Sequence, residues 1–595
     1  MPVVSMNSMR RRCAAVLLAA VGASAAWGDT KNWIGGTSTW DNPAAWSPVQ
    51  IPQSTDLAYV SQTGAVVTYQ NPSTPTGLIG LLQVDAPGAG SQVIMTGGQL
   101  TTSDTEIGDQ TTGTFTQSGG THTETADNGF YLGRTDTGVG TYNLSGTGAL
   151  IVNDELYVGL HGIAVFNQTG GSVSLGTGGG QGLLTLANGK GSGTYNLSAG
   201  TLTGKLLIVD CGSSGGLFKQ TGGTATFSLG VDVEASFGST TTYELSGTGK
   251  LTDSFCSVGF GNTASTFKQL AGTHIVTGSL SIGNGLGGDY ILSGGTLTTG
   301  QTLVGANSKG KFDQSGGTQT ITGALQLGSA GGAKNLDVFN LSGGTVTSAT
   351  LTISSSGFFN QTAGAAATQA FTMSGNSTYK LGGGTLKIAT LQLDATKSKL
   401  DLANQGMLVD YTGSSPLPTI RAYALSGYNG GAWTGNGLTS TTAAANPGTR
   451  AVGYGEAKDV LGLTGNNTAT WDGYTVDATS ILVRYTIAGD ANLDGSVGFA
   501  DLVKVAQNYG NSSGSAIWTQ GDFDYDGKVG FSDLVKVAQN YGGALPASVP
   551  EFGANFEGDL ARAFAVAQTP EPGSAGVFLL AAAGVMSRRR SRRVN

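Results

Sequence analysis

The chain has 595 residues, of which 99 are Gly and 14 are Pro, and only 11% are charged. Gly without a strict three-residue period excludes collagen, and 39% apolar residues are too many for a wholly disordered chain. The formal net charge is −8, and because Arg clusters at both ends the body is more acidic still, which argues against a nucleic-acid partner. Abundant Gly and scarce helix formers favour an all-β protein with many tight turns, built as an elongated repeat or as several domains.

Residues 1–28 have the organisation of a secretory signal peptide. A positive segment, Arg10–Arg12, precedes the apolar run Cys13–Ala26, which ends in small residues. We therefore expect the protein to be exported, with cleavage after Ala25 or Gly28.

Residues 29–92 are predicted to form an N-terminal cap on the repeat that follows. The segment carries Trp33, Trp40 and Trp46. The end of a stack of coils exposes unpaired strand edges, which a cap must cover. The segment resembles the Trp-rich N-terminal stretch of exported bacterial repeat proteins with autotransporter-like passenger coils. A structural cap is our preferred interpretation, and a carbohydrate-binding platform is the alternative.

Residues 93–399 contain one pattern in two alternating forms. The first is Phe-x-Gln and the second is an aromatic residue-x-Leu, and the two interleave without a break at spacings of 20 to 29 residues. A Gly-rich turn follows most of them. The first form begins at Phe115, Phe166, Phe218, Phe267, Phe312 and Phe359, and the second at Tyr142, Tyr195, Tyr243, Tyr290, Phe339 and Tyr379.

This pattern predicts a solenoid. Period-two alternation with Gly at the corners is typical of short strands, and a repeat in the twenties indicates coils that bury residues against their neighbours. We predict a parallel β-helix of about 12–13 coils with one half-repeat per coil, and two half-repeats per coil is the alternative. Phe115 and Gln117 share a strand face that carries Leu in the next coil, so we expect a buried aromatic ladder with Gln bonded to the backbone.

Cysteine and histidine add little chemistry to the predicted coils. Cys211 and Cys256 belong to coils about two apart, which is too far for a disulfide, so we expect two buried thiols. The three His residues of the chain, His122, His161 and His274, are isolated in the sequence and are expected at corners or on the surface.

After the repeat, residues 400–487 keep strand patterns and turns, with strands expected at Met407–Tyr411 and Ile481–Tyr485. This region is predicted to be a C-terminal β cap or a small β domain. Residues 543–568 are assigned to a linker.

Residues 488–542 carry the clearest chemical signature of the chain, two nearly identical loops 32 residues apart. Oxygen ligands at loop positions 1, 3, 5 and 12, with Gly at position 6 and a backbone carbonyl at position 7, are the design of a calcium loop. Calcium is preferred to zinc because His and Cys are missing from the segment, and two ions are expected. The predicted ligands are Asp490, Asn492, Asp494, Ser496 (carbonyl) and Asp501 in loop 1, and Asp522, Asp524, Asp526, Lys528 (carbonyl) and Asp533 in loop 2.

Each loop leads into a predicted helix, and Asp at position 12 with no preceding helix separates the pair from ordinary EF-hands. The arrangement resembles a type I dockerin. The resemblance implies calcium binding at the residues named above and a cohesin-like partner. Position 9 is Gly498 or Gly530, where the family usually has a side chain, so water must complete the shell. Val497 and Val529 at position 8 predict a short pairing between the two loops.

Residues 569–595 have the organisation of a sorting signal. Pro570-Glu571-Pro572 leads into a short apolar stretch and then a tail with five Arg. The stretch is shorter than the roughly 20 residues that a spanning helix needs. The triad resembles the PEP-CTERM signal, which implies transient membrane anchoring, processing by an exosortase and release to the cell surface or extracellular matrix. A plain C-terminal membrane anchor is the alternative.

These features favour a non-enzymatic structural or adhesive protein of the cell surface or matrix. The alternative is a secreted polysaccharide-binding or polysaccharide-degrading protein, because parallel β-helices host lyases and dockerins accompany glycoside hydrolases. Such enzymes need paired carboxylates in a groove. The acids of the repeat form no obvious column, and no catalytic residue is predicted; the acids considered are Asp104, Glu106, Asp127, Asp154, Glu155, Asp210, Asp232 and Glu234.

Overall fold

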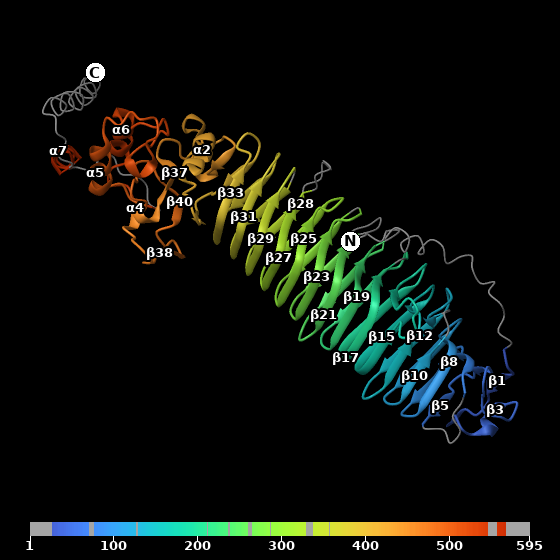
Figure 1. The fold of residues 1–595 in the computed structure, drawn as a ribbon. Helices are drawn as coiled ribbons and strands as arrows, with labels where there is room; N and C mark the ends of the chain where they lie inside the picture. The colour runs from blue at the N-terminus through green and yellow to red at the C-terminus, as the bar shows by residue number, and fades with distance from the viewer. Residues whose placement is uncertain are drawn as a thin grey trace. The chain divides into compact units, whose positions relative to one another are not determined.

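The computed structural model describes residues 27–70, 77–125, 129–210, 212–235, 239–259, 265–285, 287–328, 337–355, 357–545 and 556–566. The protein is mainly β and forms a parallel β-solenoid of about 15 turns (Figure 1). It divides into two compact units, the first ending at Phe359 and the second beginning at Asn360. The predicted parallel β-solenoid is therefore confirmed, while the predicted number of coils was too small.

Each coil of the first unit has three sides. The first side carries the aromatic motif, the second follows a Gly-rich turn, and the third ends in an apolar-x-apolar-Gly sequence. The first side is formed by β7 (Ser91–Met95), β9 (Thr112–Gln117), β12 (Val139–Leu144), β18 (Gly216–Gln220), β20 (Thr241–Leu245), β22 (Ser265–Gln269), β24 (Gly288–Leu292), β26 (Gly310–Gln314), β28 (Asp337–Leu341) and β30 (Gly357–Gln361).

The second and third sides run together as one strand in most coils. Two strands, β15 (Ile163–Leu175) and β17 (Ser192–Val209), also include the aromatic side. The remaining strands of these sides are β8 (Gln99–Ile107), β10 (Thr121–Glu124), β11 (Phe130–Leu132), β13 (Ala149–Val152), β14 (Glu155–Val158), β16 (Leu183–Leu186), β19 (Thr224–Val233), β21 (Lys250–Val258), β23 (Thr273–Ile282), β25 (Thr296–Val304), β27 (Thr318–Leu327) and β29 (Thr345–Ile353).

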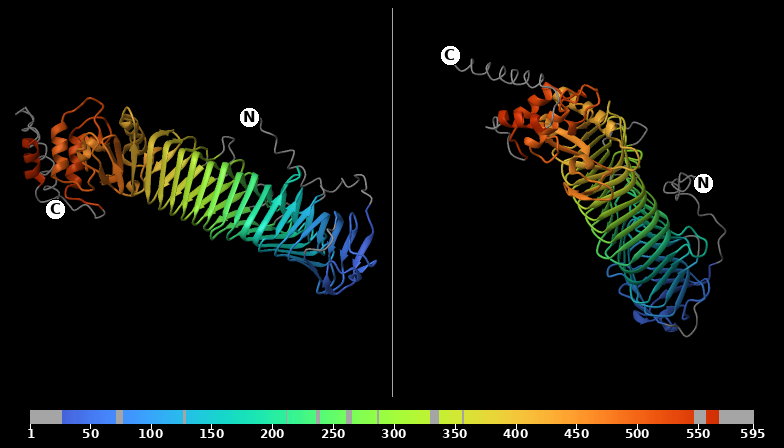
Figure 2. Two further views of the ribbon diagram at one scale, coloured as in Figure 1. Left: turned by 60° about the horizontal axis from the view of Figure 1, so that its bottom comes forward. Right: turned by 60° about the vertical axis from the view of Figure 1, so that its left-hand side comes forward.

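Successive aromatic motifs stack in adjacent coils. In the parallel register Phe115 is opposite Tyr142, and Tyr142 is opposite Phe166. From Phe115 to Phe359 the centroids of consecutive rings lie 4.6 to 5.0 Å apart, with planes within 14° of parallel. Figure 2 shows the parallel strands that impose this spacing. One half-repeat per coil is thereby confirmed, as is the buried ladder.

The Gln of each Phe-x-Gln motif satisfies polar groups inside the coil. Gln220 Nε2 donates to the carbonyls of Lys250 (3.0 Å) and Gly223 (3.2 Å), and its Oε1 accepts from the Tyr243 hydroxyl at 2.7 Å. The same pattern recurs along the ladder. Coils that carry the second form of the motif (aromatic residue-x-Leu) are called Leu-type coils. A Tyr in a Leu-type coil therefore requires a Gln in the preceding coil, because a buried hydroxyl needs a hydrogen-bond partner.

The Gly-rich turns need backbone that other residues rarely adopt. Gly295 has φ +80°, and a Cβ placed on it would lie 2.2 Å from the carbonyl oxygen of Gly272 in the preceding coil. The turn is thus fixed both by its left-handed conformation and by the close approach of two coils.

Parallel coiling begins before the first aromatic motif. The strand β4 (Leu57–Val60) pairs with β6 (Ile79–Val84), and β5 (Val66–Tyr69) pairs with β7. These coils lack the Phe-x-Gln signal, which is why the number of turns predicted from the motif was too small. The chain starts with β1 (Thr30–Trp33), β2 (Thr37–Thr39), the 3₁₀ helix η1 (Pro43–Ala45) and β3 (Trp46–Ser47).

The three Trp residues of this N-terminal end are buried, with exposures of 2% or less. Trp46 packs edge-on against Trp33 and Trp40, with ring centroids 5.0 and 4.9 Å apart. A carbohydrate platform needs exposed rings, so the cluster acts as a structural core of this end.

The second unit opens with further coils and then changes architecture. Its strands β31 (Ala365–Met373), β32 (Thr378–Leu381), β33 (Thr385–Leu393), β34 (Lys399–Asp401) and β36 (Gly437–Thr439) pair in parallel. The strand β35 (Gly406–Asp410) pairs in parallel with β33 and antiparallel with β40 (Ser480–Ile487). In turn β40 pairs antiparallel with β37 (Arg450–Glu456).

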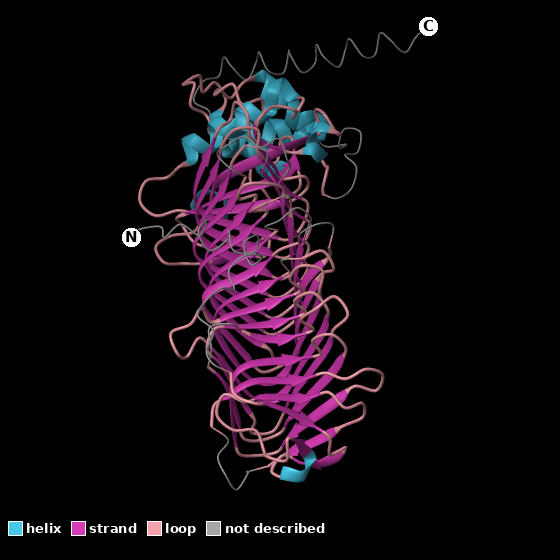
Figure 3. Ribbon diagram, turned by 90° about the vertical axis from the view of Figure 1, so that its right-hand side faces the viewer, coloured by secondary structure: helices cyan, strands magenta, loops and turns pink. Residues whose placement is uncertain are grey.

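The described α-helices all belong to this second unit (cyan in Figure 3). They are α2 (Leu417–Tyr428), α3 (Thr441–Ala444), α4 (Ala457–Leu461), α5 (Phe499–Asn508), α6 (Phe531–Asn540) and α7 (Phe556–Val566), with the 3₁₀ helices η2 (Asn429–Gly431) and η3 (Trp518–Gln520). A small hairpin joins β38 (Ala469–Trp471) to β39 (Tyr474–Val476). The strands expected near Met407 and Ile481 are present, whereas α2, α3 and α4 were not foreseen.

The expected placement of the His residues is corrected by the structure, and the expected burial of the two Cys thiols is confirmed for one of them. His122 and His274 are fully buried rather than at corners. His274 Nε2 lies 2.8 Å from Asp253 Oδ2, and its Nδ1 lies 3.0 Å from the Tyr290 hydroxyl. Cys256 is a buried free thiol, as expected, and Cys211 lies outside the described residues.

Candidate metal centre

The two Asp-rich loops have the same backbone. Loop 1 (residues 490–501) connects β40 to α5, and loop 2 (residues 522–533) connects η3 to α6. Position 4 of each loop is left-handed although it is not Gly, with φ +58° at Leu493 and +61° at Tyr525. Position 6 is also left-handed, with φ +89° at Gly495 and +83° at Gly527. The recurrence of two unusual conformations at matching positions means that both loops make the same turn.

The carboxylates at positions 1 and 12 are buried at the base of each loop. Asp490, Asp501, Asp522 and Asp533 are all at most 1% exposed. The side chains at positions 3 and 5 lie nearer the surface. In loop 2 one carboxylate oxygen from each of Asp522, Asp524 and Asp533 lies within 4.8 Å of the other two.

The position-12 Asp ties the start of each loop to its helix. Asp501 accepts from the backbone N–H groups of Ala491 (2.8 Å) and Gly498 (2.8 Å). Asp533 accepts from Phe523 (2.8 Å) and Gly530 (2.9 Å) in the same way. Each carboxylate is therefore held in place by the backbone and by the helix N-terminus.

The position-1 Asp folds the loop around itself. Asp490 Oδ2 accepts from Gly495 N at 2.9 Å, and Asp522 Oδ2 accepts from Gly527 N at 3.0 Å. Asp522 Oδ1 is buried and has no hydrogen-bond donor among the described residues. A buried carboxylate oxygen without a donor is costly, and a bound cation would remove that cost.

Burial raises the pKa of all four base carboxylates. The pKa rises to about 6 for Asp490 and Asp533, and to about 7 for Asp501 and Asp522. Hydrogen bonds from the loop backbone oppose this rise, and neighbouring carboxylates add to it. The donor set therefore fits a hard divalent cation, because the side chains at the ligand positions offer oxygen atoms and most of them are carboxylates.

The two loops do not pair with each other as expected. Val497 exchanges backbone hydrogen bonds with residues 542 and 543, which follow α6, while Val529 does so with residues 510 and 511, which follow α5. Each loop thus pairs with the segment beyond the other loop's helix. This exchange interlocks the two halves, and the position-8 pattern alone could not distinguish it from direct pairing.

The loops are built into the sheet of the second unit. The Tyr525 hydroxyl donates to the Val452 carbonyl of β37, and Trp518 Nε1 donates to the Asp490 carbonyl at 2.6 Å. A Cβ at Gly453 of β37 would lie 2.4 Å from Leu493 Cδ2. Gly453 therefore makes room for the position-4 side chain of loop 1.

Two Arg residues that the sequence did not single out contact the loops. Arg484 of β40 donates to the Leu493 carbonyl at 3.1 Å. Arg421 of α2 donates to the Tyr525 carbonyl at 3.3 Å and lies 3.4 Å from Asp522 Oδ2. Arg421 is about a hundred residues away from loop 2 in the chain, so no local pattern could have revealed it.

A second group of carboxylates lies together in the first unit, which the sequence did not predict. Tyr131 stacks on Tyr157 at a centroid distance of 5.2 Å, and Glu106 is opposite Tyr131 in the register. Burial, then the carboxylates of Asp104 and Glu155, raise the pKa of Tyr131 to about 12. The acids therefore do gather around one aromatic pair, although their spacing from the ladder aromatics varies. Asp127 lies outside the described residues.

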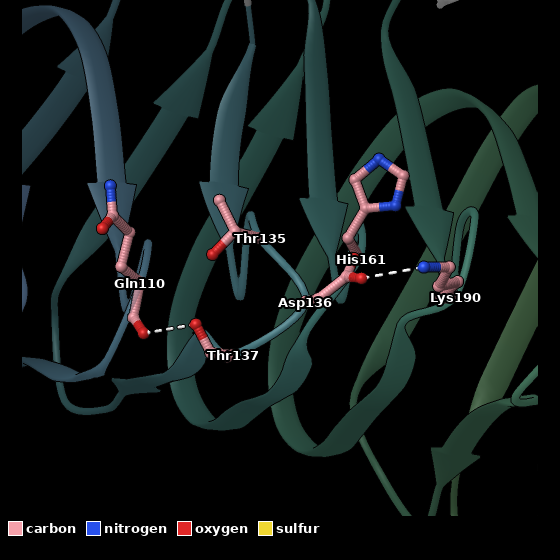
Figure 4. Close-up of a pocket in the computed structure, with 6 residues that line it drawn as sticks. All are labelled: Gln110, Thr135, Asp136, Thr137, His161 and Lys190. Carbon is pink, nitrogen blue, oxygen red and sulfur yellow. Dashed lines mark hydrogen bonds and ion pairs between the residues drawn. The ribbon is translucent and has the colours of Figure 1, made fainter.

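One open pocket lies on the turns of the first unit, lined by Gln110, Thr135, Asp136, Thr137, His161 and Lys190 (Figure 4). Lys190 Nζ forms an ion pair with Asp136 at 2.9 Å, and both side chains are exposed.

The predicted signal peptide and the predicted sorting signal lie largely outside the described residues. The sorting motif Pro570, Glu571 and Pro572 lies outside them, as do residues 1–26 of the signal segment. Within the described ranges, no helix is long and apolar enough to cross a bilayer.

Comparisons of the chain with protein-family models, with curated proteins and with solved structures gave no match.

Proposed function

We propose that the protein is a non-enzymatic structural or adhesive component of the cell surface or extracellular matrix, whose C-terminal loops bind two calcium ions. The observation that carries the calcium part is the duplicated loop, with matching left-handed positions at Leu493 and Tyr525 and buried carboxylates at positions 1 and 12. Repetition of the same turn, with buried carboxylates at the same two positions, argues against a chance cluster of acids.

The residues that would hold the ions follow from the loop positions. In loop 1 they are Asp490, Asn492, Asp494, Asp501 and the carbonyl of Ser496, and in loop 2 they are Asp522, Asp524, Asp526, Asp533 and the carbonyl of Lys528. A bound calcium ion supplies positive charge that offsets the repulsion among these carboxylates. Backbone N–H groups hold the position-1 and position-12 carboxylates in their observed orientation.

The structural role rests on the regular coils. Their stability comes from stacked, buried side chains. The apolar surface of the ladder lies in the core, where a ligand does not reach it. Export, exosortase processing and a cohesin-like or exopolysaccharide partner remain part of the proposal.

Calorimetric titration of the chelator-treated full chain with calcium tests the metal proposal. We expect two ions per chain, and one ion after Asp526→Ala, which removes an exposed ligand of loop 2. Asp459→Ala is the matched control, because Asp459 is an exposed acid of α4 outside both loops. Heat of binding that is absent in the parent chain, or unchanged by Asp526→Ala, would refute the proposal.

A further inference from the structure

The two loops differ in charge in a way that should favour loop 2. Loop 2 has four Asp side chains at its ligand positions, whereas loop 1 has three and an amide at Asn492. Calcium affinity rises with the number of charged ligands when the geometry is the same. On its ligands alone, loop 2 would therefore be the tighter site.

Arg421 changes this balance, because its guanidinium lies against loop 2. Its Nη2 is 3.4 Å from Asp522 Oδ2, and the Asp522 side chain is fully buried while that of Arg421 is 19% exposed. A Cβ at Gly527 would lie 2.8 Å from the same Nη2. The positive group thus sits beside the position-1 carboxylate and the position-6 turn.

The corresponding Arg of loop 1 is placed differently. Arg484 Nη1 donates to the Leu493 carbonyl, and its guanidinium carbon lies 5.8 Å from the centre of the Trp471 ring. Among the described residues, no ion pair joins Arg484 to a carboxylate of loop 1. Both Arg residues hold a position-4 carbonyl, and the charge of Arg484 also acts on Asp490, but within the described ranges Arg421 alone of the two lies within ion-pair distance of a predicted ligand.

We propose that Arg421 is a built-in counter-cation of loop 2, so that calcium enters loop 2 in competition with it and binds there more weakly than in loop 1. The inference rests on the proposed calcium function and specifies its regulation. Arg421 compensates the buried charge of Asp522 when no ion is bound, and an ion that takes over this role repels the guanidinium.

The position of Arg421 couples loop 2 to the rest of the second unit. Arg421 also donates through Nε to the Ala516 carbonyl at 3.1 Å, and it belongs to α2. From the same helix the Tyr423 hydroxyl accepts from Leu393 N of β33 at 3.1 Å. Tyr428 at the end of α2 packs on Tyr525, with ring centroids 4.8 Å apart. A shift of Arg421 on calcium binding would therefore be felt along α2 and at β33.

Single-loop variants test the inference with calcium itself as the probe. Asp494→Ala leaves loop 2 as the only complete site, and Asp526→Ala leaves loop 1; both residues are exposed, so the fold should persist. We expect a weaker calcium affinity in the Asp494→Ala chain than in the Asp526→Ala chain. Equal affinities, or a tighter loop 2, would overturn the inference even if no Arg variant folds.

Neutralising Arg421 provides the second arm. In the Asp494→Ala background, Arg421→Met should raise the calcium affinity of loop 2, and Arg421→Lys should leave it low. Arg484→Met in the same background is the matched control and should leave loop 2 unchanged. Suppose that the Arg421→Met chain melts normally but binds calcium no more tightly than the Asp494→Ala chain. This result would contradict the inference about Arg421 but not the proposed calcium function. A parent chain that binds no calcium would contradict the proposed function as well.

Discussion

Single residues in the ladder show how buried polar groups find hydrogen-bond partners inside a β-solenoid. Each Tyr of the Leu-type coils donates its hydroxyl to the Gln of the preceding coil, as Tyr243 does to Gln220. At one step the partner is missing, because Phe339 follows the coil of Gln314, and Gln314 Oε1 is buried without a donor among the described residues. This site is a local defect in an otherwise regular pattern.

Phe339→Tyr should repair the defect. The new hydroxyl would occupy the place that Tyr243 takes relative to Gln220, and a hydrogen bond of this kind contributes about 1 kcal/mol. We expect a higher free energy of unfolding by denaturant titration. Phe166→Tyr is the control, because the preceding coil offers Leu144 instead of Gln, and it should destabilise by about 1–3 kcal/mol. Equal effects of the two changes would refute the pairing rule.

The buried carboxylates of the loops make the metal-free second unit sensitive to pH. Their pKa values are raised to about 6 or 7 in the folded state, against an ordinary value near 4 in the unfolded chain. As pH falls from above 7 toward 4, the folded protein takes up protons first, so its stability in chelator should increase. Protons compete with calcium, so calcium affinity should decrease over the same range. A melting temperature in chelator that falls from pH 7.5 to pH 5 would contradict this sign.

At the scale of elements, how far the sequence could predict the structure depends on the range of the interactions. The Phe-x-Gln spacing predicted the coils, because the residues of one coil are close in sequence and the same contacts repeat. The coils at β4–β7 carry no such motif, so the sequence predicts a cap there. The helix α2 was missed because its buried residues are few, namely Ile420, Ala424 and Gly427. The loop ligands were visible within twelve residues, whereas Arg421 and the exchanged pairing of Val497 depend on contacts between distant segments.

Truncation of one ring should test the ladder as an element. Phe218 is fully buried between Tyr195 and Tyr243, so Phe218→Ala should cost about 3–5 kcal/mol through lost packing and a cavity. Leu217→Ala is the matched control on the neighbouring, outward-facing position, and it should cost much less. The comparison is made by equilibrium denaturation. Comparable losses for both would mean that Phe218 is not a core residue.

At the scale of the whole molecule, the two units draw their stability from different sources. The first unit depends on stacking between coils, while the second also contains the two acidic loops. Calcium binds only the folded loops in this account, so at a hundred times its Kd it should add about 2.7 kcal/mol per site to the second unit. Calorimetric melting of the full chain with calcium or chelator should therefore move one transition and leave the other unchanged. A shift of both transitions, or of neither, would disagree with this division.

A crystal structure of the full chain grown with calcium tests the central claim most directly. The account predicts one ion in each loop, bound by oxygen atoms of Asp490, Asn492, Asp494 and Asp501 or of Asp522, Asp524, Asp526 and Asp533 at about 2.3–2.6 Å. The carbonyls of Ser496 and Lys528 should complete the protein ligands. Loops that hold only water at high calcium concentration, with Arg421 still paired to Asp522, would contradict it.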